Sequence, residues 1–396
     1  MRTSLLSTSL AGALAFSALA TGCRSTPKAE RCTYVEDGFG PAGTVPVRAE
    51  TVVEGLEVPW SLAFLPPSAE GRAGDVLVTE RPGRLRLVRD GALVPQPLAT
   101  IEVDPGGEGG LQGLALHPDF ASTRQFFLYF TAQKDGEKVN RLERWVLSED
   151  RRSALFEKRL MDDLPGARFH HGGRIRIGPD RMLYVSVGDA REPALAQDLR
   201  SPAGAILRLG LEGEIPSDNP TPGSPIFISG VRNSQGFDWL SDDRLIVTDH
   251  GPSGDTLRFG HDRVQVASAG ENLGWPETYG CEVKAGYVPA IISWKSAAPP
   301  GGAAIYRGDA IPEWKGSLLI GTLKSRHLQR VQLSEDGTAV ALHEVYLEGE
   351  PPNGLGRIRE VVNGPDGHLW VTTSNCDGRG ECGPNKDRIV RILPAR

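Results

Sequence analysis

The sequence predicts an all-β protein, a six-bladed β-propeller of four-stranded antiparallel blades. One pattern recurs six times along the chain: an apolar stretch, a polar turn often built on Pro-Asp, and a second apolar stretch. The copies begin roughly 50 to 65 residues apart, which is the size of one propeller blade. The chain also contains 48 Gly and 30 Pro, a composition that suits many short strands joined by turns.

Each copy is predicted to form the inner hairpin of one blade. The six copies begin at Leu62, Leu114, Ile175, Phe237, Ala303 and Arg359. Because the tight turn lies at one end of each hairpin, the residues before its first strand and after its second strand meet at the other end. Inner strands surround the propeller axis, so these flanking residues are expected to converge on one pocket.

Length and charge limit the possible classes of protein. At 396 residues the chain could hold two domains, but six evenly spread repeats favour one propeller domain over residues 49–396. The formal net charge is −6, so no basic field indicates a nucleic-acid partner.

The N-terminus is typical of an export signal. Arg2 precedes an apolar stretch that is too short to span a bilayer, and the stretch ends in Leu-Ala-Thr-Gly-Cys at Cys23. This ending resembles a bacterial lipobox, so residues 1–22 are predicted to be a lipoprotein-type signal peptide and residues 23–48 a lipid-attached tether. We therefore expect an exported, periplasmic protein that contacts the membrane only through a lipid on Cys23; secretion without lipid is the alternative.

Four further cysteines are expected to form disulfides in that oxidising compartment. They are Cys32, Cys281, Cys376 and Cys382. Three pairings are possible. We favour Cys376 with Cys382, which closes a small loop and leaves Cys32 with Cys281.

Cations gather at the converging hairpin ends although the chain is acidic overall. The four that flank inner strands are Arg232, Lys324, Arg357 and Arg359. Around one cavity they would repel one another unless carboxylates or a bound anion compensated them. Glu80, Glu108 and Asp189 could form salt bridges between blades, but four cations at equivalent positions favour a polyanionic small molecule.

Two further segments at these ends carry candidate chemistry. His170 and His171 precede two glycines and the third inner strand, where a neutral imidazole could act as a general base; we favour His170. Gly251 and Pro252 follow the fourth hairpin, and their carbonyl oxygens could bind calcium. From the residues alone, an ordinary turn at Gly251 is the stronger interpretation.

With these residues assembled, the chain resembles the soluble quinoprotein sugar dehydrogenases, the family of PQQ-dependent glucose and aldose sugar dehydrogenases. The resemblance runs from about Val52 to Leu393 and rests on the stretches VPWSLAFLP, GEGGLQGLALHPDF, HHGGRIRIGPD, GVRNSQGF, DHGPSG, GENLGWPE, GTLKSRHLQRV and GRIREVVNGPDGHLWV. Family members are six-bladed propellers. The chain is more similar to the shorter aldose sugar dehydrogenase branch, because it lacks a long insertion before the fifth blade.

The resemblance implies a cofactor, PQQ, and an active-site Ca²⁺. It places His170 on the catalytic base, Arg232 and Asn233 on residues that contact the quinone, and Gln235 beside them. Lys324, Arg357 and Arg359 match the cations that hold the three carboxylates of PQQ. The carbonyls of Gly251 and Pro252 match the calcium ligands.

The implied reaction is oxidation of the C1 hydroxyl of an aldose to a lactone. His170 would remove the hydroxyl proton, Arg232 would stabilise the developing negative charge, and an external quinone or redox protein would accept the electrons. Glu108, Phe169 and Trp294 are assigned to the substrate end. Glu108 stands where glucose-oxidising members have Gln, and Phe169 where they have Asp, so the identity of the sugar stays open.

Two other functions remain as alternatives. One is a non-catalytic propeller that binds a glycan or a protein partner, which would not require His170 together with four cations. The other is a calcium-dependent lactonase, whose chemistry favours acidic and amide side chains around the metal. The cation-rich set of residues favours the dehydrogenase over both.

Overall fold

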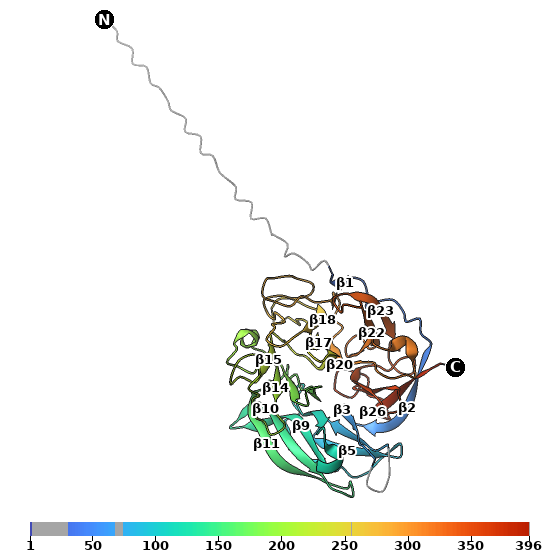
Figure 1. Cartoon of the computed structure of the whole chain (residues 1–396). Helices are drawn as coiled ribbons and strands as arrows, with labels where there is room; N and C mark the ends of the chain where they lie inside the picture. The colour runs from blue at the N-terminus through green and yellow to red at the C-terminus, as the bar shows by residue number, and fades with distance from the viewer. Residues whose placement is uncertain (2–30, 68–73, 255, 396) are drawn as a thin grey trace.

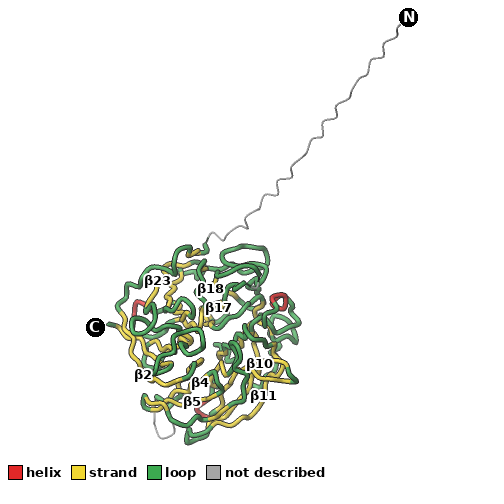
Figure 2. Tube along the Cα trace, turned by 180° about the vertical axis from the view of Figure 1, so that it is seen from behind, coloured by secondary structure: helices red, strands yellow, loops and turns green. Residues whose placement is uncertain are grey.

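The computed structural model describes residues 1, 31–67, 74–254 and 256–395, and six small antiparallel sheets form a ring within it (Figure 1). The prediction of a six-bladed β-propeller is therefore confirmed. In the described residues, helical structure is confined to three short turns, α1 (Phe120–Thr123), η1 (Pro193–Gln197) and η2 (Pro312–Trp314) (Figure 2). No helix in this part of the chain is long and apolar enough to cross a membrane.

Each predicted repeat forms the two inner strands of one blade, numbered here in chain order from blade 1 to blade 6. The pairs are β3 (Pro59–Phe64) with β4 (Val76–Glu80), β8 (Leu111–Leu116) with β9 (Gln125–Lys134), β12 (Ile175–Ile177) with β13 (Leu183–Val187), β16 (Gly236–Ser241) with β17 (Arg244–Asp249), β20 (Pro300–Ile305) with β21 (Leu318–Thr322), and β24 (Ile358–Asn363) with β25 (Leu369–Thr373).

Outer strands complete each blade. From blade 1 to blade 6 they are β5 (Arg84–Arg89) with β6 (Ala92–Leu93) and β7 (Ala99–Thr100), β10 (Glu137–Leu147) with β11 (Ala154–Pro165), β14 (Ala205–Leu209) with β15 (Ile226–Ser229), β18 (Asp262–Ala267) with β19 (Ile292–Trp294) and β1 (Thr33–Val35), β22 (Leu328–Leu333) with β23 (Val340–Tyr346), and β26 (Asp387–Pro394) with β2 (Val47–Leu56). Blades 1 and 4 thus have five strands where four were predicted.

Blade 6 combines an early strand with the last three strands of the chain. The early strand β2 pairs antiparallel with the last strand, β26, with Thr51 opposite Val390. This pairing closes the ring and covers a sheet edge that would otherwise expose unpaired backbone groups.

The predicted boundary at residue 49 is corrected by the structure. The predicted signal peptide, Cys23 and residues 24–30 lie outside the described residues. Cys32, however, is bonded to Cys281, and β1 pairs parallel with β19 of blade 4. The chain is therefore attached to the propeller from Cys32 onward. The second disulfide joins Cys376 to Cys382, so the favoured pairing is confirmed.

The Pro-Asp turns explain why the inner hairpins fold locally. In two of them the Asp side chain accepts a hydrogen bond from the backbone N–H two residues further on, from Met182 to Asp180 and from His368 to Asp366. This local bond stabilises a tight turn before the second strand begins.

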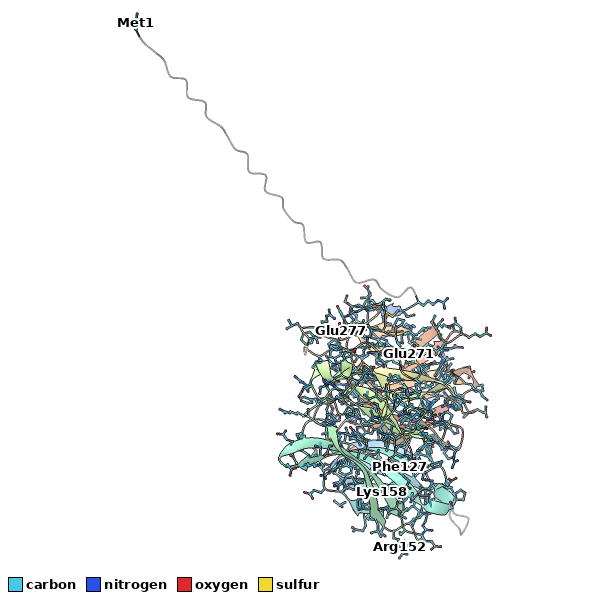
Figure 3. All side chains as sticks on the ribbon, turned by 60° about the vertical axis from the view of Figure 1, so that its left-hand side comes forward. Met1, Phe127, Arg152, Lys158, Glu271 and Glu277 are labelled. Atoms are coloured by element: carbon cyan, nitrogen blue, oxygen red, sulfur yellow. A yellow bond between two sulfur atoms is a disulfide. The ribbon has the colours of Figure 1, made fainter. Side chains whose placement is uncertain are left out.

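The hydrophobic core is divided among the interfaces between neighbouring blades. Leu128 of blade 2 and Leu85 of blade 1 belong to one buried cluster, for example, and Val390 of blade 6 and Leu319 of blade 5 belong to another. Lys158 and Arg152 of blade 2 lie at the far end of the ring from Glu271 and Glu277 of blade 4 (Figure 3). Six such interfaces hold the inner hairpin ends in place around the axis.

Candidate active site

A cavity of about 400 Å³ lies where the inner hairpin ends converge. Its walls come from five blades, which agrees with the predicted convergence of flanking segments. Predicted site residues that line it are Glu108, His170, Arg232, Asn233, Gly251, Pro252, Lys324 and Arg357.

His170 is buried at the start of blade 3 in a left-handed conformation, with φ of 64°. Its Nδ1 lies 2.7 Å from Asp189 Oδ1, and its backbone N–H donates to Glu108 Oε2 at 3.3 Å. Because a carboxylate only accepts hydrogen bonds, Nδ1 carries the proton in the neutral imidazole, and Nε2 then keeps its lone pair. No hydrogen bond to Nε2 occurs within the described residues, so this atom can accept a proton.

Asp189 is itself held by two other groups. Trp275 Nε1 donates to Oδ2 at 2.8 Å, and the backbone N–H of Arg191 donates to Oδ1 at 2.8 Å. The carboxylate is fully buried, so these bonds fix its orientation toward His170.

His171 faces away from the cavity. Its Nδ1 lies 3.0 Å from Asn140 Oδ1 and 3.2 Å from Thr131 Oγ1, both in blade 2. Burial lowers the pKa of His171 to about 4, so the ring is neutral. Of the two neighbouring histidines, only His170 lines the cavity, which agrees with the choice made from sequence.

Arg232 and Asn233 form part of the cavity wall and are held by Asp249. The backbone N–H groups of both residues donate to this carboxylate, at 3.1 and 2.8 Å. The Arg232 guanidinium donates to Ser253 Oγ at 2.8 Å and lies 5.4 Å from the centre of the Trp275 ring. These contacts hold a permanent positive charge in a buried, defined position.

Next to them, His250 is a structural residue. Its Nε2 lies 2.7 Å from the Pro300 carbonyl oxygen, and its Nδ1 lies 3.3 Å from Asn233 Nδ2. Burial lowers the pKa of His250 to about 3, so it stays neutral and supports Asn233.

Gly251 and Pro252 lie on the cavity wall where a tight backbone contact requires glycine. A Cβ on Gly251 would lie 1.9 Å from the Gly260 carbonyl oxygen. The Gly251 N–H donates to Asp262 Oδ1 at 2.9 Å, and the Pro252 carbonyl accepts the Gly260 N–H at 2.9 Å. Among the described residues, no group of three or more His, Cys, Asp or Glu could hold a metal ion.

The four predicted cations occupy three different environments. Lys324 is exposed in the cavity and forms no ion pair among the described residues. Arg357 also lines the cavity and donates to Asp377 Oδ2 from Nε at 3.0 Å and from Nη2 at 2.7 Å. Arg359 is buried beneath it and donates to the same oxygen at 3.2 Å. Arg232 forms the opposite wall. Two of the four predicted cations are therefore paired with a carboxylate, whereas Lys324 is not.

Gln235 holds two of the buried arginines behind the cavity wall. Its side-chain oxygen accepts from Arg359, and its backbone carbonyl accepts from Arg174 Nε at 2.8 Å. Gln235 is not among the residues that line the cavity, so it supports Arg359 and does not face a bound molecule directly. Burial lowers the pKa of Arg359 to about 10, which leaves the guanidinium charged at neutral pH.

At the predicted substrate end, Glu108 pairs with Arg379, whose Nη1 lies 2.6 Å from Oε1. Burial alone would raise the pKa of Glu108, but the Arg379 charge and hydrogen bond lower it to about 2. Phe169 does not line the cavity itself. It packs against Arg379, whose guanidinium lies 5.3 Å from the ring centre.

The assignment of Trp294 to the substrate end is corrected. Trp294 ends β19, an outer strand of blade 4, and packs in the core between blades 4 and 5. Its Nε1 donates to the Phe39 carbonyl at 3.1 Å. In sequence, Trp294 precedes the fifth inner hairpin, but its strand belongs to the previous blade and directs the ring away from the cavity.

Sequence reasoning also missed important residues. Asp377 and Arg379 lie in the loop between the paired Cys376 and Cys382, directly after the sixth inner hairpin. Charges inside a short closed loop at this end of a blade are a signal that could have located them. No feature of the sequence marks Trp275 or Asp249, because Trp275 acts by holding Asp189 and Asp249 acts by holding the backbone of Arg232 and Asn233.

The buried His-Asp pair and the cation-lined cavity define a propeller enzyme with acid-base and anion-binding groups in one pocket. The sequence model for Glucose / Sorbosone dehydrogenase matches residues 56–389, and the chain belongs to this family of sugar oxidoreductases. The resemblance to quinoprotein sugar dehydrogenases is confirmed.

Individual relatives agree with this assignment. The aldose sugar dehydrogenase YliI of Escherichia coli is 31% identical, over 85% of this chain and 92% of its own. Quinoprotein glucose dehydrogenase B of Acinetobacter calcoaceticus is 28% identical, over 68% and 74%. The PQQ-bound aldose sugar dehydrogenase of Streptomyces coelicolor superposes with a TM-score of 0.77 at 34% identity, covering 89% of this chain and 99% of that one.

Proposed function

We propose that this protein is a PQQ- and calcium-dependent aldose dehydrogenase that oxidises the C1 hydroxyl of a sugar to a lactone. The observation that carries the proposal is the His170–Asp189 pair in a cavity that also presents Arg232, Lys324 and Arg357. A base beside several cations suits the removal of a proton next to an anionic cofactor.

The residues present fit PQQ, which bears three carboxylates. Lys324 has no ion pair among the described residues, and Arg357 and Arg359 share the single carboxylate of Asp377. Positive charge therefore remains for an anion after internal pairing. The cavity of about 400 Å³ is in the range for small-molecule sites. PQQ, when bound, supplies the hydride acceptor.

The fit to calcium rests on Gly251 and Pro252. A carbonyl oxygen has two lone pairs, so Pro252 keeps one beyond its bond to Gly260. Two carbonyls are fewer than the six to eight oxygen ligands that calcium takes, so cofactor and water would complete the shell. Bound there, calcium would act as a Lewis acid.

His170 has the geometry of the general base. Nε2 would accept the proton of the C1 hydroxyl as the C1 hydride leaves the sugar, and Asp189 would stabilise the resulting imidazolium. Arg232 is held by Ser253 and Trp275 and would stabilise negative charge that develops beside it. Since these groups are already oriented, little reorganisation is needed during the reaction.

The remaining parts of the proposal concern partners and location. The substrate is an aldose that meets the cavity at Glu108, and an external quinone or redox protein takes up the electrons. The predicted signal peptide supports export to the periplasm, with attachment through a lipid on Cys23.

Reconstitution tests the proposed function. The purified protein is incubated with PQQ and calcium, passed through gel filtration, and assayed for dye reduction with a panel of aldoses. We expect retained quinone absorbance and sugar-dependent turnover. Loss of the quinone on gel filtration would contradict the cofactor, whereas retained quinone without turnover would favour a binding propeller.

A further inference from the structure

The loop from Cys376 to Cys382 lies between β25 and β26 of blade 6 and is closed by a disulfide. Its base is fixed to the blade, because the backbone N–H groups of Asn375 and Cys376 donate to Asp387 at 2.6 and 3.2 Å. The loop thus begins and ends at defined points beside the cavity.

The first residue inside the loop, Asp377, faces the cofactor cations. Its side chain is 2% exposed and accepts hydrogen bonds from Arg357 and Arg359. Among the described residues it is the one carboxylate that forms an ion pair with either arginine. Two neighbouring buried guanidinium groups repel each other. The shared Asp377 carboxylate offsets this repulsion and so fixes the positions of both arginine side chains.

Two residues further on, Arg379 reaches the substrate end. It pairs with Glu108 of the segment before blade 2, and the other oxygen of Glu108 accepts the N–H of His170. Arg379 is 49% exposed, and exposed ion pairs are weak on their own. Its contact with Glu108 therefore depends on a loop that is already held in shape.

The loop also packs closely on the site. A Cβ on Gly380 would lie 2.6 Å from Arg357 Cδ. The backbone thus approaches the arginine side chain directly, and a change in the loop would move Arg357.

We propose that the disulfide-closed loop is a positioning element of the active site. Asp377 orients Arg357 and Arg359 for the anionic cofactor, and Arg379 orients Glu108 at the substrate end. This inference rests on the proposed function and deepens it. It follows that the Cys376–Cys382 bond supports cofactor affinity and substrate recognition together.

The decisive comparison uses the two disulfides of the same protein. Cys376→Ser with Cys382→Ser is expected to raise the Kd for PQQ at least about tenfold, the scale of losing a hydrogen bond to a charged group, and to raise KM for the aldose. Cys32→Ser with Cys281→Ser is the matched control, since it removes a bond outside the cavity lining. Equal PQQ affinity and KM in both variants would overturn the proposal.

Single substitutions keep the proposal testable if the cysteine variants fold poorly. Arg379→Gln is expected to raise KM and leave PQQ affinity unchanged, with Arg388→Gln of the same blade as the control. Asp377→Asn is expected to raise the Kd for PQQ at least about tenfold. If the loop had only a structural role, each substitution would change KM and the Kd for PQQ together. An unchanged or tighter Kd for PQQ in Asp377→Asn would contradict the role assigned to Asp377.

The two proposals fail in different ways. If the parent protein does not bind PQQ, the proposed function is wrong. If the parent binds PQQ and oxidises sugars while every loop variant matches it, only the role of the loop is wrong.

Discussion

His170 Nδ1 lies 2.7 Å from Asp189 Oδ1, and both side chains are buried where the hairpin ends of blade 3 meet the cavity. This pair determines the tautomer of His170 and keeps Nε2 free to accept a proton. Asp189 follows the second strand of the hairpin that His170 precedes, so one blade supplies the base and the group that orients it.

Asp189→Asn tests this relationship. An amide keeps the shape of the side chain but can donate to Nδ1 and so stabilise the wrong tautomer. We expect turnover to fall by about 10² to 10⁴ with PQQ affinity unchanged, measured by dye reduction and by fluorescence titration. Unaltered kcat would show that the pair does not orient the base.

His170→Ala is expected to leave PQQ bound and to reduce kcat roughly 100-fold or more, the usual scale for a general base. The comparison variant is His368→Ala, which changes a partly exposed histidine in the turn of blade 6. Equal activity in the two variants would remove His170 from the mechanism.

Lys324→Ala is expected to raise the Kd for PQQ more than it changes any other property of the protein. Lys324 has no ion pair among the described residues, so its charge is available to an anion. Lys315→Ala of the same blade is the control, since Lys315 is exposed and pairs with Asp309. The measurement is the Kd for PQQ as a function of salt. An identical Kd in both variants would contradict cation-assisted binding.

Calcium removal should abolish turnover without unfolding the protein. The candidate ligands are carbonyl oxygens of a wall segment, and the described residues contain no acidic cluster whose repulsion would be released. We expect a chelator to stop dye reduction, added calcium to restore it, and the circular dichroism spectrum to stay unchanged. Full activity in the presence of chelator would exclude a calcium requirement.

Acidification should destabilise the fold below about pH 6.5. Burial lowers the pKa of His250 to about 3, and those of His171 and His327 to about 4, whereas unfolded histidine titrates near 6.5. Between these values the unfolded chain binds more protons, so stability is full above pH 6.5 and falls as the pH drops. Each group contributes at most about 1.4 kcal/mol per pH unit.

Three buried carboxyls oppose this trend, because burial also raises the pKa values of Asp249 and Asp387. Burial raises the pKa of Asp262 to about 6, so its contribution to stability is present at low pH and is lost as the pH rises from about 4 to 6. We expect Tm to be lower at pH 5 than at pH 7.5, and the difference to shrink in His327→Gln but not in His368→Gln. A pH-independent Tm would contradict the buried neutral histidines.

Much of the site was predictable because hairpin ends are local features. His170, Arg232, Gly251, Lys324 and Arg357 flank inner strands in sequence, and the structure brings all of them to one cavity. Trp294 was misplaced because flanking an inner strand in sequence does not say whether a residue ends the previous blade.

The sequence by itself determined the number of blades, the six inner hairpins and the positions that face the axis, because repeat spacing and turn chemistry are properties of short segments. Only the tertiary structure decided which charges neutralise one another. Arg379 meets Glu108 across 271 residues of chain, and Asp377 joins Arg357 and Arg359. Such contacts depend on ring closure by β2 and β26, and no local pattern encodes the distance between loops of different blades.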